Sequence, residues 1–447
     1  MYTTNASICD TTGKLLFFTN GCEIAHANGE TMENGDLLNP GTFRTLWCIE
    51  YGEGYNGGPQ NALILPWPDS PGVYRLFHKR YIYNVAYSRC DVLFSSTVDM
   101  NANNGRGRVT EKNIPLVSDT LSRTDLVAVK HANGKDWWVV TPRRNGNEFY
   151  VLKFTKDGIT DTLKQTIGIK TNAAGLPINE NQGAMVFSPD GSKMFRTARY
   201  EPVMMYDFDR ETGVFTNFDT IHYEYGDQFI GEVGCAVSPN NRYLYLSCRQ
   251  FLYQLDLQAP DISASQTMVA EWDGFTTPFP TLFWQCQLGP DCKIYIMAGG
   301  DTRYWHVVHN PDLPGQQCDV EQRGLVLATR CGASMPAFPN YRLSTLDNPG
   351  KPCTSTVSIH APPQVQEGEA LFIYPNPASG QATVEYRLSG PRDNRLALHD
   401  LTGRQVLEIA LPDNQGRVVL PLETLAPGIY WCQIAGRAFA QKLVVMR

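Results

Sequence analysis

The chain has 447 residues and a net charge of -7, with 38 glycines and 29 prolines spread along its length. A chain of this length exceeds one ordinary hydrophobic core, so we expect two or more domains. The negative charge disfavours nucleic-acid binding, and no apolar run approaches the roughly 18 residues of a membrane-spanning helix.

Twelve cysteines fit an oxidising compartment, and none of them forms a CxxC pair of the zinc or redox type. The start of the chain, MYTT, lacks the basic and apolar regions of a signal peptide. If the protein is exported, we expect its export signal to have been trimmed or to lie outside this sequence.

Residues 1–346 consist of apolar stretches separated by short polar turns, as in "AMVFSPDGSKMF" and "AVSPNNRYLYLS". Turns of Asp, Asn, Pro or Gly between apolar runs are typical of β-hairpins. Three of these turns contain Pro189, Pro239 and Pro290, which are 50 and 51 residues apart. The spacing predicts one four-stranded blade per interval, and thus an all-β β-propeller of about seven blades. A β-sandwich array is the alternative, but it does not explain so regular a spacing.

Two stretches contain parts of known ligand-binding loops. "GEGYNG", residues 52–57, has the GxGxxG spacing, but a strand-like run follows it where a dinucleotide fold needs a helix, so we interpret it as a turn. In "DMNANNGRG", Asp99, Asn101 and Asn103 alternate as at the start of a calcium loop, but the required Gly and Glu are one position late. We expect a structural loop there, with a weak structural cation site as the alternative.

His306 and His309 form an HxxH pair in the β-branched and aromatic stretch "RYWHVVHNP". Strand residues three apart point to opposite faces, so we expect these two side chains not to share a metal. We predict no cofactor for the chain.

Six cysteines flank hairpins or a loop, and each pair of neighbours is a candidate disulfide. The candidates are Cys235 with Cys248, Cys286 with Cys292, and Cys318 with Cys331, although the sequence leaves the connectivity open. Cys432 lies in an apolar row, so we expect it to be a buried free thiol.

No catalytic motif of the GxSxG, P-loop, HExxH or kinase type occurs. The carboxylates that a glycosidase would need are scattered, and we expect the tryptophans to lie in the core or rim of a blade, with stacking on sugar rings as the alternative. These residues are Asp227, Glu232, Glu271 and Asp273, and Trp67, Trp272 and Trp284.

Several stretches of this part occur in a characteristic order, among them "ASICDTTGKLLFFTNG", "NALILPWPDSPGVYRLF", "VDMNANNGRGRVTEKNIPLV" and "HVVHNPDLPGQQC". They resemble the large propeller-like proteins that Bacteroidetes bacteria secrete, which are often labelled gliding-motility-associated. The resemblance spans most of residues 4–342 and implies a secreted propeller whose first blade is incomplete or closed differently.

Residues 347–369 are rich in Pro, Ser and Thr and have the composition of a linker. Short strand candidates follow at 382–388, 395–400, 405–410, 417–421, 428–434 and 438–445. Tyr430, Cys432 and Ile434 alternate and should share one face. We predict a small immunoglobulin-like β-sandwich over residues 370–447.

Four stretches of this tail, "YPNPASG", "DLTGRQVL", "LAPGIYWCQI" and "QKLVVMR", resemble in order and spacing the type A sorting domain of the type IX secretion system. The residues that carry the resemblance are Tyr374, Pro375, Asn376, Pro377, Asp400, Gly403, Gly428, Tyr430 and Lys442. The resemblance implies export by an outer-membrane shuttle, removal of the tail by a surface sortase, and attachment of the mature protein to lipopolysaccharide.

Together these observations predict a binding or scaffold protein at the bacterial surface, with a glycan or a protein as ligand and no catalysis. One alternative is a secreted glycan-active hydrolase or lyase that works in the central pocket of the propeller. Another is a self-assembling subunit of a surface fibre or layer that keeps its tail.

Overall fold

The computed structural model describes residues 3–83, 88–171, 183–198, 201–224, 234–332, 334–353, 370–374, 376, 378–388, 395–400, 404–434 and 440–446. The chain divides into two compact units, Met1–Val357 and Ser358–Arg447. We call them unit 1 and unit 2. The division falls inside the predicted linker, residues 347–369. No helix in the described ranges is long and apolar enough to cross a membrane.

The described residues of unit 1 form six antiparallel sheets, one of three strands and five of four strands. In every sheet the strands pair in chain order. The strands are β1 (Ala6–Cys9), β2 (Leu15–Thr19), β3 (Ile24–His26); β4 (Ala62–Pro66), β5 (Val73–Tyr83), β6 (Ser88–Asp99), β7 (Arg108–Leu121); β8 (Val127–Lys130), β9 (Trp137–Pro142), β10 (Glu148–Thr155), β11 (Gly158–Thr166); β12 (Met185–Phe187), β13 (Lys193–Arg196), β14 (Val203–Asp209), β15 (Val214–Ile221); β16 (Gly234–Val237), β17 (Tyr243–Cys248), β18 (Phe251–Asp256), β19 (Thr267–Glu271); β20 (Phe283–Leu288), β21 (Ile294–Ala298), β22 (Thr302–Val308) and β23 (Val320–Cys331).

Helical segments in unit 1 are short and lie between strands. α1 (Thr42–Arg44) continues into the π-helical turn η1 (Thr45–Glu50), and two 3-10 turns are η3 (Ser263–Ser265) and η4 (Gly315–Cys318). α2 (Ala102–Gly105) contains two asparagines with φ of 53° and 56°, so it is a left-handed turn rather than a helix.

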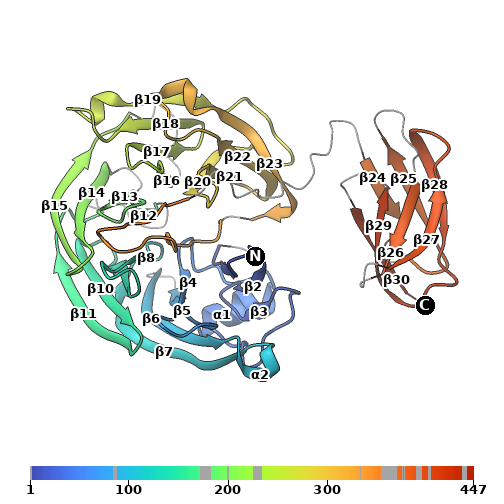
Figure 1. Cartoon of the computed structure of the whole chain (residues 1–447), viewed down its shortest axis with the longest axis horizontal. Helices are drawn as coiled ribbons and strands as arrows, with labels where there is room; N and C mark the ends of the chain where they lie inside the picture. The colour runs from blue at the N-terminus through green and yellow to red at the C-terminus, as the bar shows by residue number, and fades with distance from the viewer. Residues whose placement is uncertain are drawn as a thin grey trace. The chain divides into compact units, whose positions relative to one another are not determined.

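Figure 1 shows the six sheets following one another around a common centre, with β4, β8, β12, β16 and β20 toward the middle and the last strand of each sheet toward the rim. The hydrophobic core lies between consecutive sheets. One cluster, for example, joins Trp138 and Val140 of β9 to Met194 and Met204 of the next sheet. The four sheets from β4 to β19 each contribute apolar side chains to two clusters, so each of them is stabilised by burial against both the preceding and the following sheet.

Pro189, Pro239 and Pro290 each lie in the turn after the first strand of a sheet, following β12, β16 and β20. The predicted interval of one four-stranded sheet is therefore confirmed for this part of the chain. The predicted number of about seven is wrong, since the described residues of unit 1 form six sheets. The estimate assumed a uniform interval, but the chain before β4 forms a single three-stranded sheet and residues 334–353 form no sheet strand.

Residues 334–345, which we call the strap, follow β23 and return to the middle of these sheets, where Figure 1 shows them as an orange trace. Four hydrogen bonds join the strap to other parts of unit 1. Asn5 Nδ2, in the segment before β1, donates to Ser334 Oγ (2.6 Å), and Tyr341 Oη donates to Ile64 O on β4 (2.7 Å). Asn340 Nδ2 donates to Pro189 O in the β12–β13 turn (2.8 Å), and Met335 N donates to Gln285 Oε1 on β20 (3.2 Å). An isolated bridge also pairs Thr345 with Asn133 in the β8–β9 turn. The strap thus connects five of the six sheets.

Two disulfides lie in unit 1, Cys22–Cys48 and Cys292–Cys353. The second joins the β20–β21 turn to the chain just after the strap, across a sequence separation of 61 residues. A crosslink over a loop of this length stabilises the folded state by about 4 kcal/mol on the chain-entropy estimate. It also fixes the point at which the chain leaves unit 1.

The predicted pairings of Cys235 with Cys248, Cys286 with Cys292, and Cys318 with Cys331 are wrong. Cys292 pairs with Cys353, and the other five cysteines are free thiols. The strand register gives the reason, since the cysteines do not lie opposite one another. Cys235 lies opposite Leu246, and Cys248 lies opposite Phe251. Cys286 lies opposite Ile296, and Cys331 lies opposite Thr302. Cys318 is buried in η4.

A buried ion pair connects two neighbouring sheets of unit 1. Arg196 on β13 lies 3.0 Å from Asp125, just before β8, and their side chains are 1% and 3% exposed. The carboxylate also accepts hydrogen bonds from Ser122 Oγ (3.2 Å) and Thr124 Oγ1 (3.1 Å). The charge of Asp125 is therefore balanced and hydrogen-bonded inside the core, as a buried charge requires.

Buried histidines should make the stability of unit 1 depend on pH. The imidazole of His78 on β5 lies 2.8 Å from Asn39 Oδ1 and 3.0 Å from Ser96 Oγ, and burial lowers its pKa to about 3. Below pH 6.5 the unfolded chain binds a proton that the folded chain does not, so this stabilisation is complete above pH 6.5 and is lost as the pH falls toward 3. His306, whose pKa burial lowers to about 4, acts in the same direction.

When the pH falls from 7 to 4.5, we expect each of these two histidines to lower the unfolding free energy of unit 1 by roughly 2–3 kcal/mol. Urea unfolding followed by tryptophan fluorescence at several pH values measures this loss. His78→Gln should flatten the profile by that amount, whereas the exposed control His222→Gln should leave it unchanged. An unaltered slope in His78→Gln would contradict the assignment.

Unit 2 has two antiparallel sheets packed over one core. One sheet has the order β24-β25-β28 and the other β27-β26-β29-β30. The strands are β24 (Ala370–Tyr374), β25 (Gln381–Arg387), β26 (Arg395–His399), β27 (Gln405–Ala410), β28 (Gln415–Pro421), β29 (Gly428–Ile434) and β30 (Ala440–Val445). The predicted alternation is confirmed, because Tyr430, Cys432 and Ile434 are buried while Trp431 between them is 44% exposed. Cys432 is a buried free thiol, as predicted, and burial raises its pKa to about 12.

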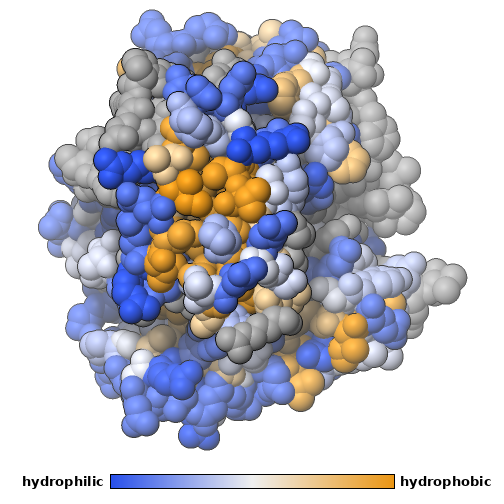
Figure 2. Space-filling view, turned by 90° about the vertical axis from the view of Figure 1, so that its right-hand side faces the viewer, coloured by the Kyte–Doolittle hydropathy of each residue, from blue (hydrophilic) through white to orange (hydrophobic). Residues whose placement is uncertain are grey.

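β27 and β28 each form an edge of their sheet. They present apolar side chains that pack only in part on the core, Val406, Leu407, Ile409 and Val418, and Val419 beside them is 51% exposed. Figure 2 shows an apolar area of this kind surrounded by polar surface. We call the side chains of these two edge strands the apolar strip.

Candidate functional site

The segment around the predicted Pro-Asn-Pro motif connects the two sheets of unit 2. Asn376 Oδ1 accepts a hydrogen bond from the backbone amide of Val444 on β30 (2.9 Å). Ala378 pairs in parallel with Val445 and donates its own amide to Val444 O (2.9 Å). The chain thus leaves β24 in one sheet and is attached at once to the last strand of the other. Pro375 and Pro377 lie outside the described residues.

The other predicted motif residues are distributed over the two sheets. Tyr430 Oη donates to Ala426 O (2.7 Å), and the side chain of Tyr374, 41% exposed, donates to Glu385 Oε2 (3.0 Å). Asp400 Oδ1 accepts a hydrogen bond from the backbone amide of Arg404 (3.1 Å), and Gly403 lies outside the described residues. The backbone of Lys442 on β30 pairs with Trp431, and its side chain lies outside the described set.

Gly428, which is one of the motif residues, begins β29. Its φ is not in the left-handed region, and an added Cβ would approach Tyr430 Cε2 at 3.9 Å and Ala426 O at 4.0 Å. These are ordinary contacts, so the backbone does not require glycine at this position.

The motif-like stretches of unit 1 form a loop and a turn. "GEGYNG" is a loop in which Gly52 and Gly54 have positive φ, and β4 follows it as a strand. Asp99 Oδ1 accepts the amide of Asn101, whose Nδ2 donates to Pro71 O (3.0 Å), so these side chains stabilise a turn. Across the described ranges, no group of three or more His, Cys, Asp or Glu side chains is placed to hold a metal ion.

The two histidines of the HxxH stretch are directed differently, as predicted. His306 is fully buried against Phe283, with ring centroids 4.6 Å apart, whereas His309 Nε2 lies 2.8 Å from Glu321 Oε2.

The tryptophans have structural contacts: Trp67 lies under the Arg75 guanidinium at 4.7 Å, and Trp272 and Trp284 are partly buried. Of the scattered carboxylates, Asp273 pairs with Arg323 at 2.7 Å, Glu271 is exposed, and Asp227 and Glu232 lie outside the described residues.

Comparison with known protein families decides what unit 2 is. Residues 372–446 match the family described as the secretion system C-terminal sorting domain. Residues 372–446 are a type IX secretion system sorting domain. The prediction from the tail motifs is thereby confirmed. A sorting domain of this kind marks the protein for export, to the cell surface or the medium.

Similar solved structures include PorZ, described as an essential bacterial surface component of the type IX secretion system of Porphyromonas gingivalis, at 13% identity over 95% of this chain and 63% of PorZ, with a TM-score of 0.32. A protein from Lactobacillus plantarum has 11% identity over 94% of this chain and 98% of its own, with a TM-score of 0.40. TolB from Acinetobacter baumannii has 12% identity over 90% and 76% of the two chains, with a TM-score of 0.31. Each TM-score is below 0.5, so these neighbours do not define a function for this chain. The curated proteins include no significant match.

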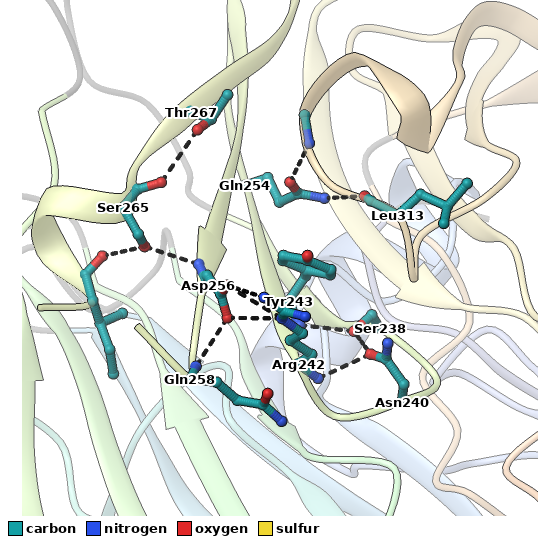
Figure 3. A network of polar contacts seen from close by, with 12 residues as sticks. Ser238, Asn240, Arg242, Tyr243, Gln254, Asp256, Gln258, Ser265, Thr267 and Leu313 are labelled. Carbon is teal, nitrogen blue, oxygen red and sulfur yellow. Dashed lines mark hydrogen bonds and ion pairs between the residues drawn. The ribbon is translucent and has the colours of Figure 1, made fainter. Parts of the chain in front are cut away.

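Outside the sorting domain, a polar pocket of about 490 Å³ opens between the sheet β16–β19 and the loop that joins β22 to β23. Figure 3 shows the side chains that fix its walls. Gln254 on β18 is 3% exposed; its Oε1 accepts the amide of Gly315 (2.7 Å) and its Nε2 donates to Leu313 O (2.8 Å). These two bonds hold the loop against the sheet, so the pocket is formed in advance of any ligand.

Charged groups line the pocket. Arg242 binds Asp256 through both Nε (3.1 Å to Oδ1) and Nη2 (2.8 Å to Oδ2), and this contact lowers the pKa of the Asp256 carboxyl. Asp312 on the opposite wall accepts the backbone amide of Asn240 (3.0 Å). The sequence analysis missed these residues, because their only sequence signals are a hairpin turn and a Pro-rich loop 72 residues apart.

Proposed function

We propose that this protein is a cell-surface binding protein with a six-bladed β-propeller, which the type IX secretion system exports through an immunoglobulin-like sorting domain. The observation that carries the proposal is the sorting domain at residues 372–446. The succession of up-and-down sheets in unit 1 supports a propeller, and the hydrogen bond from Tyr430 to Ala426 resembles the tyrosine corner of immunoglobulin-like sandwiches.

The partners in export are the outer-membrane shuttle and the sortase. The apolar strip on β27 and β28 supplies a surface for contact with this machinery, because in the described part of unit 2 both strands are sheet edges and their apolar side chains are only partly buried. After transport, the sortase removes the tail and attaches unit 1 to lipopolysaccharide.

Binding is favoured over catalysis by the position of the strap. An enzyme that used the central pocket of a propeller would need converging side chains near the inner strands β4, β12 and β20. The strap occupies part of that region with its own hydrogen bonds, among them Tyr341 to Ile64 and Asn340 to Pro189. The ligand site is therefore expected away from the centre, at turns and loops of individual sheets.

The test is an intact mass, with peptide mapping, of the protein taken from its native cell surface. We expect loss of the chain after about residue 368 and the added mass of a heavy glycolipid. Recovery of the protein only from inside the cell would overturn the proposal. An intact tail on surface protein would overturn the lipopolysaccharide attachment and would favour a subunit that assembles with its tail in place.

A further inference from the structure

The pocket between β16–β19 and the β22–β23 loop has fixed hydrogen-bonding groups on two walls. On the sheet side, Arg242 and Asp256 hold each other in a two-bond pair, and their side chains are 45% and 22% exposed. On the loop side, Asp312 is anchored through one oxygen to the amide of Asn240. No basic side chain in the described part of the chain forms an ion pair with Asp312.

The pocket also has an apolar wall, since Leu313 is 43% exposed and Pro314 follows it. Both residues belong to the loop segment that Gln254 holds in place. The side chain of Leu313 is free to contact a ligand, because only its backbone carbonyl is used in that hydrogen bond. Ligand sites commonly combine apolar side chains with a few fixed polar groups, as these two walls do.

The charges decide which class of ligand fits. Arg242 and Asp256 neutralise each other, so Asp312 leaves the pocket with a net charge of about -1, which disfavours an anion. A cation would lie close to the Arg242 guanidinium, which lines the same pocket. A neutral ligand with many hydroxyl groups can donate to the carboxylates, accept from the guanidinium, and place its C–H face on Leu313 and Pro314. The volume of about 490 Å³ lies within the usual range for small-ligand sites.

We propose that this pocket binds a neutral sugar unit of a glycan, with Asp312 and the Arg242–Asp256 pair as its polar contacts and Leu313 as its apolar contact. The proposal deepens the binding function proposed above and rests on it. It places the ligand at the rim of one sheet, away from the strap.

The test uses the full chain on an array of neutral oligosaccharides, acidic oligosaccharides and basic peptides, followed by calorimetric titration of the best neutral oligosaccharide. Asp312→Asn keeps the side-chain shape and an acceptor for the Asn240 amide, and should weaken binding about 10-fold or more, because a charged hydrogen-bond acceptor is lost. Leu313→Gln, which leaves the backbone bond to Gln254 in place, should weaken binding several-fold.

The matched control is Asp207→Asn, because Asp207 forms the ion pair with Lys193 between the corresponding strands β13 and β14 of the preceding sheet, outside the pocket. It should bind like the unaltered protein. Equal binding by Asp312→Asn, binding only of acidic sugars or basic peptides, or no binding to the array would each overturn the inference. Surface mass analysis remains a separate test, so the proposed export and display can stand when the sugar site fails.

Discussion

A chain that ends at residue 369 is expected to be absent from the cell surface and to accumulate inside the cell. The deletion removes β24–β30, and with them the whole sorting domain. It keeps Cys353, so the Cys292–Cys353 disulfide can still form and unit 1 retains its own core. Surface labelling of intact cells, compared with whole-cell protein, measures the effect, which we expect to reduce the surface signal to background.

Gly428→Ala in the full chain is a matched control for this deletion. It changes a position inside the sorting domain at which an added Cβ makes only ordinary contacts, so the domain should fold and the protein should reach the surface normally. Circular dichroism of the truncated protein checks that unit 1 has folded. A folded, truncated protein at the normal surface level would disprove the export role of the tail.

Asp125→Ala is expected to lower the unfolding free energy of unit 1 by about 3–5 kcal/mol, because it removes the buried carboxylate that lies 3.0 Å from the Arg196 guanidinium. Arg196 is 1% exposed and extends from β13 to the chain before β8, so water cannot replace the lost carboxylate without opening the contact between two sheets. Chemical unfolding of the variant and the unaltered chain measures the difference.

The matched control for this variant is an exposed ion pair of the same unit. Lys135 lies 3.1 Å from Asp69, and the two side chains are 63% and 50% exposed, so Lys135→Ala should change the unfolding free energy by less than about 1 kcal/mol. If Asp125→Ala cost no more than this control, the buried pair would not be what joins the two sheets. Replacing both partners, as in Asp125→Ala with Arg196→Met, should recover part of the loss, because the buried guanidinium is removed together with the carboxylate.

The strand content of the chain was predictable because it depends on near neighbours in sequence. Apolar alternation and turn residues placed hairpins at "AMVFSPDGSKMF" and "AVSPNNRYLYLS", and the interval between Pro189, Pro239 and Pro290 matched one four-stranded sheet. The number of sheets was not predictable in this way. Counting by intervals assumes that every segment of the chain joins a sheet, and the strap does not.

The sorting domain was the most predictable part of the chain, because its signals are short sequence motifs in a fixed order. The structure added a reason for one of them: the Asn376 side chain accepts the amide of Val444 and so attaches the start of the domain to its last strand. It also shows that the backbone at Gly428, another motif residue, does not require glycine.

By itself, therefore, the sequence determined the strands, their turns and the export signal, which depend on residues close together in the chain. The tertiary structure decided which cysteines meet, how the strap connects the sheets, and where a polar pocket forms. These depend on contacts between residues far apart, such as Cys292 with Cys353 across 61 positions and Asn5 with Ser334 across 329. Such contacts are set by the packing of whole sheets against one another, and a local pattern contains no information about that packing.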